Sequence, residues 1–336
     1  MTAKIHSAPD RRTVLGALAA LPLGLGLGSA RAQETYPSRP VKVIVPVPPG
    51  TPADSIGRVV AANLAAQYSQ NFVVENKVGA SGFIAMQQAA QARPDGYTLF
   101  AGGLGVNVLP AVIFRNPPLD PIKAFTPVAF LGDMFNVFIV RADSPIRSMA
   151  DLLRLVKEKP GTVKIGSHPP GSSPYMGYAL LAQQTDTQWN FIPYKGGNEV
   201  LSDVLSGELD VGTSQLPTYA SMIKSGRVRA LAVSSPSRAE LLPEVPTVAE
   251  AGVPGYTVSS WLGIFALPGT PQHVLEDLSR SIGKGLATPE VRSRLAVTGF
   301  VPGYLNAQEF ARKIQQDFEL WSGVAKRAGI SVNFGS

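Results

Sequence analysis

Hydrophobic residues along the chain alternate between short runs typical of strands and spaced positions typical of helices. The run at 41–45 is apolar and ends in a loop rich in Pro and Gly. Beyond that loop, Ile56, Val60 and Leu64 recur at helical spacing. The first segment of the body therefore predicts a strand, a shaped loop and a helix.

This unit repeats along the chain. Further strand, loop and helix successions cover 72–91, 97–105, 137–156, 163–184, 191–205 and 209–217, and 229–233 and 263–266 are further strands. After 266 the pattern predicts helices only, and the last of these carries an apolar stripe of Phe310, Ile314, Phe318, Trp321 and Ala325. Such a succession predicts an α/β fold of mostly parallel sheets flanked by helices.

Two groups of strands and a helical tail predict two lobes. Lobe 1 is expected to comprise 33–137 and 260–336, and lobe 2 to comprise 138–259. The chain would then cross between the lobes twice, near 136–141 and 258–264, which predicts a hinge and a cleft.

The N-terminal segment 1–32 is read as an export signal. Arg11 and Arg12 precede an apolar run, and Ala30-Arg31-Ala32 offers a cleavage site. The run is too short to span a bilayer comfortably, although a membrane anchor is the alternative. The mature chain should be periplasmic, and the paired arginines suggest the twin-arginine route.

Composition narrows the possible functions. The 336 residues are 45% hydrophobic, which argues against disorder. The absence of Cys excludes thiol chemistry and disulfides, and three His are too few for a His-rich metal site. Removal of 1–32 lowers the net charge from +6 to +3. This small positive charge argues against nucleic-acid binding, which needs a strongly basic surface.

The predicted loops at the strand ends are rich in Gly, Ser and Thr. These loops are 46–54, 79–82, 102–107, 166–174, 194–198 and 214–217, and Lys195 is their single basic residue. Ligands of open α/β sheets bind beyond the carboxyl ends of strands, at helix N-termini, where backbone amides favour anions. The loops therefore suggest a site for a small carboxylate, although Gly and Ser also serve simply to make tight turns.

Single residues in these loops have two readings each. Asp54 is a reasonable helix cap, as is Ser55, and it could also orient a ligand. Lys195 could offset ligand charge or be a solvated turn residue. Trp261 could stack on a ligand or pack at the hinge.

Catalytic motifs are not found. The chain has no G-x-S-x-G elbow and no phosphate-binding loop, and Val108 replaces the third glycine of a dinucleotide fingerprint. A hydrolase built on Ser172 and His168 would need a third orienting group, and Pro169-Pro170 favours a rigid turn at His168. We expect no enzymatic activity, no cofactor and no metal.

Several ordered blocks resemble the Bug (Bordetella uptake gene) family, the extracytoplasmic receptors of tripartite tricarboxylate transporters. These blocks are 36–40, 48–54, 74–76, 94–99, 193–196, 226–232 and 243–252. The resemblance runs from about Tyr36 to Ile330. It implies a two-lobed periplasmic-binding-protein (Venus-flytrap) fold, capture of a carboxylate, and delivery to integral-membrane permease subunits.

The resemblance also implies where the ligand binds. It points to Pro48, Gly50, Asp54, Gly79, Ala80, Ser81, Gly82, Gly103, Ser167, Gly171, Ser172, Tyr194, Lys195, Gly196 and Gly197. The position of residues in or near the predicted loops adds five further candidates, which are Thr51, Leu104, His168, Ser214 and Trp261.

The chain departs from the family pattern in three loops. Thr51 follows Gly50 where the family commonly has a second Gly, and the middle loop holds His168-Pro169-Pro170. The third loop reads Gly102-Gly103-Leu104-Gly105. Because apolar or bulky groups replace small polar ones, we expect a ligand with more apolar surface, such as an aromatic or longer-chain carboxylate.

The leading expectation is a monomeric transport receptor. A periplasmic sensory binding protein for a carboxylate is the main alternative, since docking surfaces leave no motif here. A hydrolase on a similar scaffold is the third. We expect the ligand to stabilise the closed arrangement of the lobes.

Overall fold

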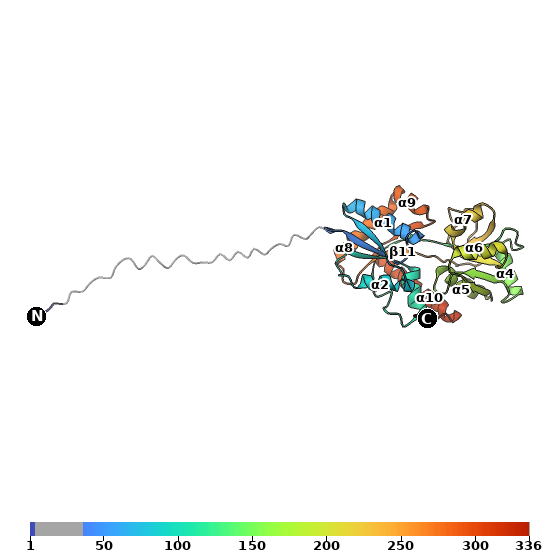
Figure 1. Cartoon of the computed structure of the whole chain (residues 1–336), viewed down its shortest axis with the longest axis horizontal. Helices are drawn as coiled ribbons and strands as arrows, with labels where there is room; N and C mark the ends of the chain where they lie inside the picture. The colour runs from blue at the N-terminus through green and yellow to red at the C-terminus, as the bar shows by residue number, and fades with distance from the viewer. Residues whose placement is uncertain (4–35, 336) are drawn as a thin grey trace. The chain divides into compact units, whose positions relative to one another are not determined.

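The computed structural model describes residues 1–3 and 36–335. The predicted export signal lies mostly outside these residues. From Tyr36 onward the chain forms one compact unit. It contains a six-stranded and a five-stranded sheet, each with its own set of helices (Figure 1). We call these two parts the first and the second lobe.

The first lobe is built on a sheet of order β12-β5-β11-β3-β1-β2. β1 is parallel to β2 and β3, whereas β11 is antiparallel to β3 and β5, and β12 is antiparallel to β5. Strands β1, β2, β3 and β5 therefore end at the same edge. The strands are β1 (Val41–Val45), β2 (Phe72–Asn76), β3 (Thr98–Gly103), β5 (Thr126–Asp133), β11 (Leu262–Ala266) and β12 (Val301–Leu305).

The second lobe is built on a sheet of order β10-β6-β9-β7-β8. β7 is parallel to β8 and β9, and β6 is antiparallel to β9 and β10. Strands β7, β8, β9 and β10 therefore end at the edge where β6 begins. The strands are β6 (Asn136–Arg141), β7 (Lys164–Ser167), β8 (Asn190–Pro193), β9 (Val211–Gln215) and β10 (Val228–Val233).

Helices cover both sheets (Figure 1). The first lobe has α1 (Pro52–Tyr68), η1 (Ala80–Gly82), α2 (Phe83–Ala90), η2 (Leu104–Val108), α3 (Leu109–Ile113), α8 (Gln272–Ala287) and α9 (Pro289–Ala296). The second has α4 (Met149–Glu158), α5 (Ser173–Thr185), α6 (Gly197–Ser206) and α7 (Leu216–Lys224). The remaining elements are α10 (Ala307–Ala328) and a small pair, β4 (Phe114–Arg115) and β13 (Val332–Asn333).

Helix α10 packs on both lobes. Its buried Phe310 contacts Phe265 of β11 with ring centroids 5.1 Å apart, and Gln183 of α5 donates to the carbonyl of Val324 at 2.8 Å. One hydrophobic cluster accordingly continues from the first sheet through α10 to the second sheet. The predicted stripe on this helix is confirmed, with Phe318 half-buried and the other four residues buried.

The two lobes are joined by short crossings. Only Met134 and Phe135 separate β5 from β6, and the return crossing at 259–261 lies beside them. The Met134 amide donates to the Ser260 carbonyl at 3.1 Å, and the Ser260 amide donates to the Met134 carbonyl at 2.7 Å. The crossings were expected near 136–141 and 258–264, whereas β6 already belongs to the second sheet.

The α/β fold is confirmed, with three differences of detail. The sheets are mixed rather than mostly parallel, because β6 and β11 run against their neighbours. The C-terminal part is not purely helical, since β12 pairs with β5 and β13 with β4. Strand β5 was not predicted, although it is central to the first sheet.

Candidate functional site

The carboxyl edges of the two sheets meet at the first crossing. β5 ends at Asp133 at the carboxyl edge of the first sheet, and β6 begins at Asn136 at the carboxyl edge of the second. Two residues span at most about 10 Å. The loops after β1 and β3 therefore lie on one side of this junction, and those after β7, β8 and β9 lie on the other.

The lobes also approach each other closely at two glycines. A Cβ placed on Gly171, before α5, would lie 2.4 Å from Cδ1 of Ile113 in α3. A Cβ placed on Gly299, before β12, would lie 2.2 Å from Cγ of Pro217 in α7. These two glycines let the lobes approach more closely than any side chain would allow.

The loop after β1 is fixed by Asp54. The buried carboxylate accepts from the Gly50 amide at 2.9 Å, from Asn76 Nδ2 at 2.7 Å and from Arg58 Nε at 3.0 Å. Burial raises the pKa of Asp54, but the hydrogen bonds from Arg58, Asn76 and Gly50 outweigh it and hold the pKa below its ordinary value. Asp54 is thus an ionised group that orders its own loop.

The helix cap at this loop is neither Asp54 nor Ser55. Thr51 is the cap, because its Oγ1 accepts from the Asp54 amide, and helix α1 begins at Pro52. The Thr51 hydroxyl also donates to the carbonyl of Pro48 at 2.9 Å. Pro52 at the first helical position has the fixed φ that the helix requires, which explains the earlier start.

The loop after β2 has an unusual backbone. Gly79, Ala80, Ser81 and Gly82 all have positive φ, at 130°, 46°, 53° and 92°. Ala and Ser rarely adopt positive φ, because this conformation costs on the order of 1–3 kcal/mol per residue. Such strained residues are concentrated at functional sites. A Cβ on Gly82 would lie 2.8 Å from Val106, so this loop packs against η2.

The loop after β3 is a π-helical turn, a feature that is frequent at functional sites. The Gly103 amide donates to Asn107 Oδ1 at 3.0 Å, and the buried Leu104 donates its amide to the Trp261 carbonyl at 3.1 Å. Asn107 also donates to the Pro121 carbonyl at 3.1 Å. Asn107, Asn76 and Arg58 were not predicted, because residues that order a loop from behind leave no motif.

On the second lobe, His168 and Ser214 form a pair. His168 Nε2 lies 2.9 Å from Ser214 Oγ, and burial lowers the pKa of His168. A Cβ on Gly197 would lie 2.5 Å from Ser214 Oγ, so the start of α6 adjoins this pair. His168 does not pair with Ser172, which instead caps α5 and donates to the Pro169 carbonyl at 2.8 Å.

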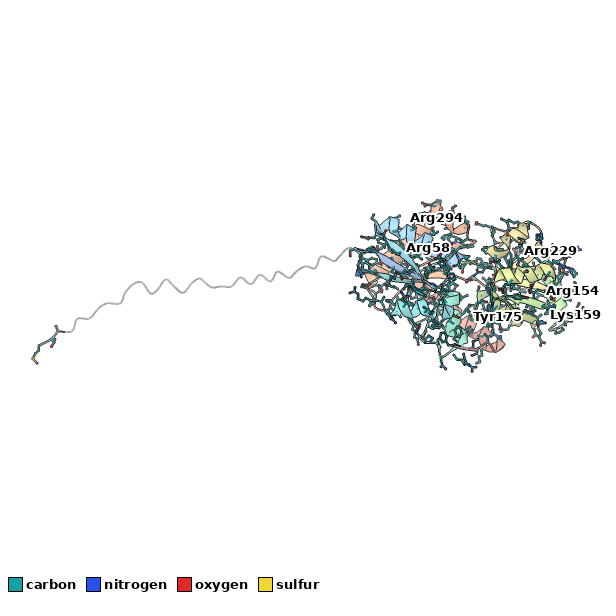
Figure 2. The ribbon with its side chains drawn as sticks, in the orientation of Figure 1. Arg58, Arg154, Lys159, Tyr175, Arg229 and Arg294 are labelled. Atoms are coloured by element: carbon teal, nitrogen blue, oxygen red, sulfur yellow. The ribbon has the colours of Figure 1, made fainter. Side chains whose placement is uncertain are left out.

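The residues around Lys195 mostly interact with their own lobe. The Tyr194 amide donates to the Ser167 carbonyl at 2.8 Å, and its hydroxyl donates to Asp203 at 2.6 Å. The exposed Lys195 donates its amide to Glu199 at 3.0 Å, and Gly196 caps α6. Figure 2 shows Arg154, Lys159 and Arg229 at the end of this lobe that lies away from the first lobe.

Trp261 lies at the second crossing and is 1% exposed. Its ring meets Phe310 edge-on with centroids 5.1 Å apart, and Nε1 donates to Asp317 of α10 at 2.6 Å. Of the two readings of Trp261, these contacts correspond to packing at the hinge.

Many predicted amide donors are already used within the protein. The amides of Gly50, Gly103, Leu104, Tyr194 and Lys195 donate to the acceptors named above. First-turn amides of a helix, by contrast, have no partner in their own helix. The start of α6 has no side-chain cap, whereas at α5 the Ser172 hydroxyl accepts from the Tyr175 amide and Pro174 has no N–H.

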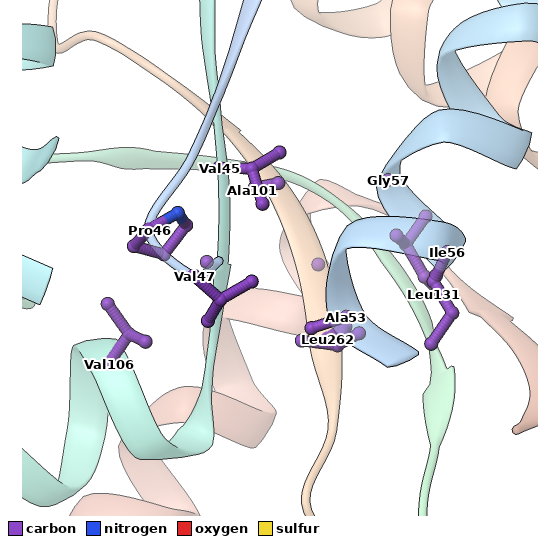
Figure 3. Close-up of a pocket in the computed structure, with 12 residues that line it drawn as sticks. Val45, Pro46, Val47, Ala53, Ile56, Gly57, Ala101, Val106, Leu131 and Leu262 are labelled. Carbon is purple, nitrogen blue, oxygen red and sulfur yellow. The ribbon is translucent and has the colours of Figure 1, made fainter. Parts of the chain in front are cut away.

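A small apolar cavity of about 30 Å³ lies under the loop after β1 (Figure 3). Its walls come from β1, the first turns of α1, β3, β5, β11 and η2, and include Val45, Val47, Ala53, Ile56 and Val106. This is about the volume of one water or methyl group, and apolar cavities stay dry.

In the described part of the chain, no helix is long and apolar enough to cross a membrane.

The fold and these facing loops define a two-lobed periplasmic binding protein. Periplasmic binding protein BugD has a solved structure that is 31% identical, with a TM-score of 0.72 over 88% of this chain and 99% of that one. Residues 56–330 match the model of the tripartite tricarboxylate transporter family receptor. The chain belongs to this family, as its resemblance to the Bug proteins indicated.

Other relatives agree. A UPF0065 protein in the tcbD-tcbE intergenic region of a Pseudomonas species is 33% identical over 326 residues, 96% of each chain. A protein of R. palustris solved with adipate is 32% identical, with a TM-score of 0.76 over 88% of this chain and 99% of that one. MatC from Rhodopseudomonas palustris, solved with bound malate, is 29% identical, with a TM-score of 0.70 over 86% and 99%. The family consists of periplasmic receptors, which confirms the expectation that this chain is not an enzyme.

Proposed function

We propose that this protein captures a small carboxylate between its two lobes and delivers it to the membrane subunits of a tripartite tricarboxylate-type permease. It reaches the periplasm through the export signal at 1–32, by the twin-arginine route, and acts as a monomer. Its two lobes divide at the crossings 134–135 and 259–261, close to the boundaries at 137/138 and 259/260 that the sequence predicts. The family and the relatives solved with adipate and malate support this proposal.

The observation that carries the proposal is the junction of the two carboxyl edges. Because Met134 and Phe135 alone separate β5 from β6, loops from both lobes border one region. These loops hold helix starts on both sides, at α1, α5 and α6, and parallel α/β sheets bind ligands at such edges. A ligand that contacts both sides stabilises the closed arrangement by its differential affinity for it.

The ligand that we infer has an apolar body, such as a longer aliphatic chain or an aromatic ring. The cavity beside Val47 and Val106 has room for one methyl or methylene group and offers no hydrogen bond. Burial of a methylene group in this cavity contributes about 0.8 kcal/mol to the binding free energy. Pro48 and Pro49 beside it cannot donate amides to a second polar group.

A thermal-shift screen of residues 33–336 tests the proposal. The panel contains adipate, malate, citrate, aspartate and aromatic acids, each with its neutral amide. A ligand at a hundredfold excess over its dissociation constant adds about 2.7 kcal/mol to the free energy of unfolding. Shifts in melting temperature confined to acids support a carboxylate receptor. Larger shifts with malate, citrate or aspartate than with every longer or aromatic acid would overturn the proposal that the ligand has an apolar body. Shifts with amides alone, or with nothing, would overturn the receptor proposal.

A further inference from the structure

Four buried polar side chains at the cleft-facing edge of the second sheet lack a hydrogen-bond partner. They are Ser167, Thr213, Asn136 and Ser173, exposed by 0%, 1%, 2% and 4%. A buried hydroxyl or amide without a partner costs roughly 1–3 kcal/mol. Such a group calls for an explanation, and a bound ligand is one.

Three of these side chains share one face of the sheet. Gly166 aligns with Gly212, so Ser167 lies beside Thr213. Thr213 aligns with Phe138, and Asn136 stands two residues before Phe138 on the same face. All three positions are at the edge where β7 and β9 end and β6 begins.

Helix α5 covers this face. Phe138, Ile165 and Val211 stand two residues from Asn136, Ser167 and Thr213 and therefore lie on the same face. They share one hydrophobic cluster with Met176 and Leu180 of α5. The unpartnered side chains therefore point to the side of the sheet on which α5 begins. Figure 2 shows Tyr175, in the first turn of α5, on the side of the second lobe that adjoins the first lobe.

The start of α5 carries no acidic side chain. Asp54 occupies the first turn of α1 and Glu199 that of α6, whereas the first turn of α5 has none. An acidic side chain at a helix start offsets the positive end of the helix dipole and competes with an anion. Of these three helix starts, α5 is the one whose positive end is not offset in this way.

We infer that the second lobe receives the anionic group of the ligand, in a notch formed by Asn136, Ser167, Thr213 and the α5 residue Ser173. The inference rests on the proposed function and adds which lobe binds the charge and which binds the apolar body. These four side chains and the Ser173 amide hold the carboxylate, while the first lobe supplies the apolar cavity. The other first-turn positions of α5 contribute no amide, because Pro174 has no N–H and the Tyr175 amide donates to Ser172. Ile113 of the first lobe packs against Gly171, two residues before Ser173, so separation of the lobes should make the notch more accessible.

Two conservative variants test the notch, namely Ser167→Ala and Thr213→Val. The titrant is adipate, or the acid of the panel that gives the largest shift with the wild type. Each variant should bind this acid roughly tenfold or more weakly, because a hydrogen bond to a charged group is lost. The melting temperature without ligand should stay the same or rise, since neither hydroxyl has a partner in the protein.

The control is Ser279→Ala, a buried hydroxyl in α8 that is bonded to Tyr304 and remote from the notch. It should leave the affinity for the acid unchanged. Unchanged acid affinity in both notch variants, with binding retained by the wild type, would overturn the inference and leave the receptor function standing. Absence of binding of every acid to the wild type would overturn both.

Discussion

His168 is a residue whose charge the fold opposes. Burial lowers the pKa of His168 from its ordinary value of 6.5, so the folded protein keeps the imidazole neutral against Ser214. The unfolded chain takes up a proton as the pH falls through about 6.5, and the folded chain does not. The contribution of His168 to stability is therefore present above this pH and is lost progressively below it.

Replacement of His168 by Gln should remove that part of the acid sensitivity. The free energy of unfolding, measured with urea over about pH 5 to 8, should fall less steeply toward acid in the variant than in the wild type. His273→Gln is the matched control, because His273 is exposed and should leave the slope unchanged. Equal slopes for the wild type and His168→Gln would contradict the effect of burial.

Residue-level chemistry was predictable where a position carries its own signal. Gly171 and Gly197 lie in loops that composition indicated, and the family resemblance pointed to both residues; both permit a close approach in the structure. The pairing of His168 with Ser214 was not predictable, because the two residues come from different strands, 46 positions apart. Asn136 and Thr213 lie just outside the strands that the apolar runs predict, and the structure extends β6 and β9 to include them.

At the scale of elements, helix α1 and the loop before it form one unit through Asp54. Helix α4 has a similar arrangement at Asp151, which accepts from the Arg147 amide at 3.2 Å, but Asp151 is partly exposed. The two helices thus provide a buried and an exposed version of the same contact.

Replacing each Asp by Ala should separate the effects of burial. Asp54→Ala removes the acceptor of the Gly50 amide and one of the two acceptors of Asn76, which keeps its bond to the Val47 carbonyl, and should cost about 3 kcal/mol of unfolding free energy. Asp151→Ala should cost about 1 kcal/mol, as is usual for an exposed helix start. Urea denaturation measures both, and a larger loss for Asp151→Ala would refute the loop-ordering role of Asp54.

The sequence predicts most elements but misses those whose partner decides the structure. Strand β12 contains Pro302 and Gly303 and forms because it is an edge strand, where a missing amide is tolerated. Strand β5 starts with Thr126 and Pro127, so no alternation of polar and apolar residues marks its beginning. The direction of β6 and β11 depends on the crossings between lobes, which local pattern does not encode.

At the scale of the whole molecule, two glycines set how closely the lobes approach. A side chain at Gly299 would meet the ring of Pro217, which lies on the other lobe. Gly299→Ala should therefore hold the lobes apart, raise the radius of gyration in small-angle X-ray scattering and weaken acid binding.

A second substitution distinguishes this wedge from local backbone strain, because Gly299 has a φ of 68°. Pro217→Ala removes the ring atoms that the new methyl group meets, so the double variant should recover the radius and most of the affinity. Failure of Pro217→Ala to restore either quantity would show that the strain at Gly299, and not contact between lobes, causes the loss.

The paired crossings at Met134 and Ser260 form a short two-stranded ribbon. Such a ribbon bends across its plane more readily than it shears along it, and α10 holds the lobes together along one side. The lobes can therefore move apart essentially by rotation about one axis, and α10 limits that rotation on one side. Ligands of different shape all require the same opening motion. Differences in affinity should therefore appear in the dissociation rate constants, while the association rate constants stay similar.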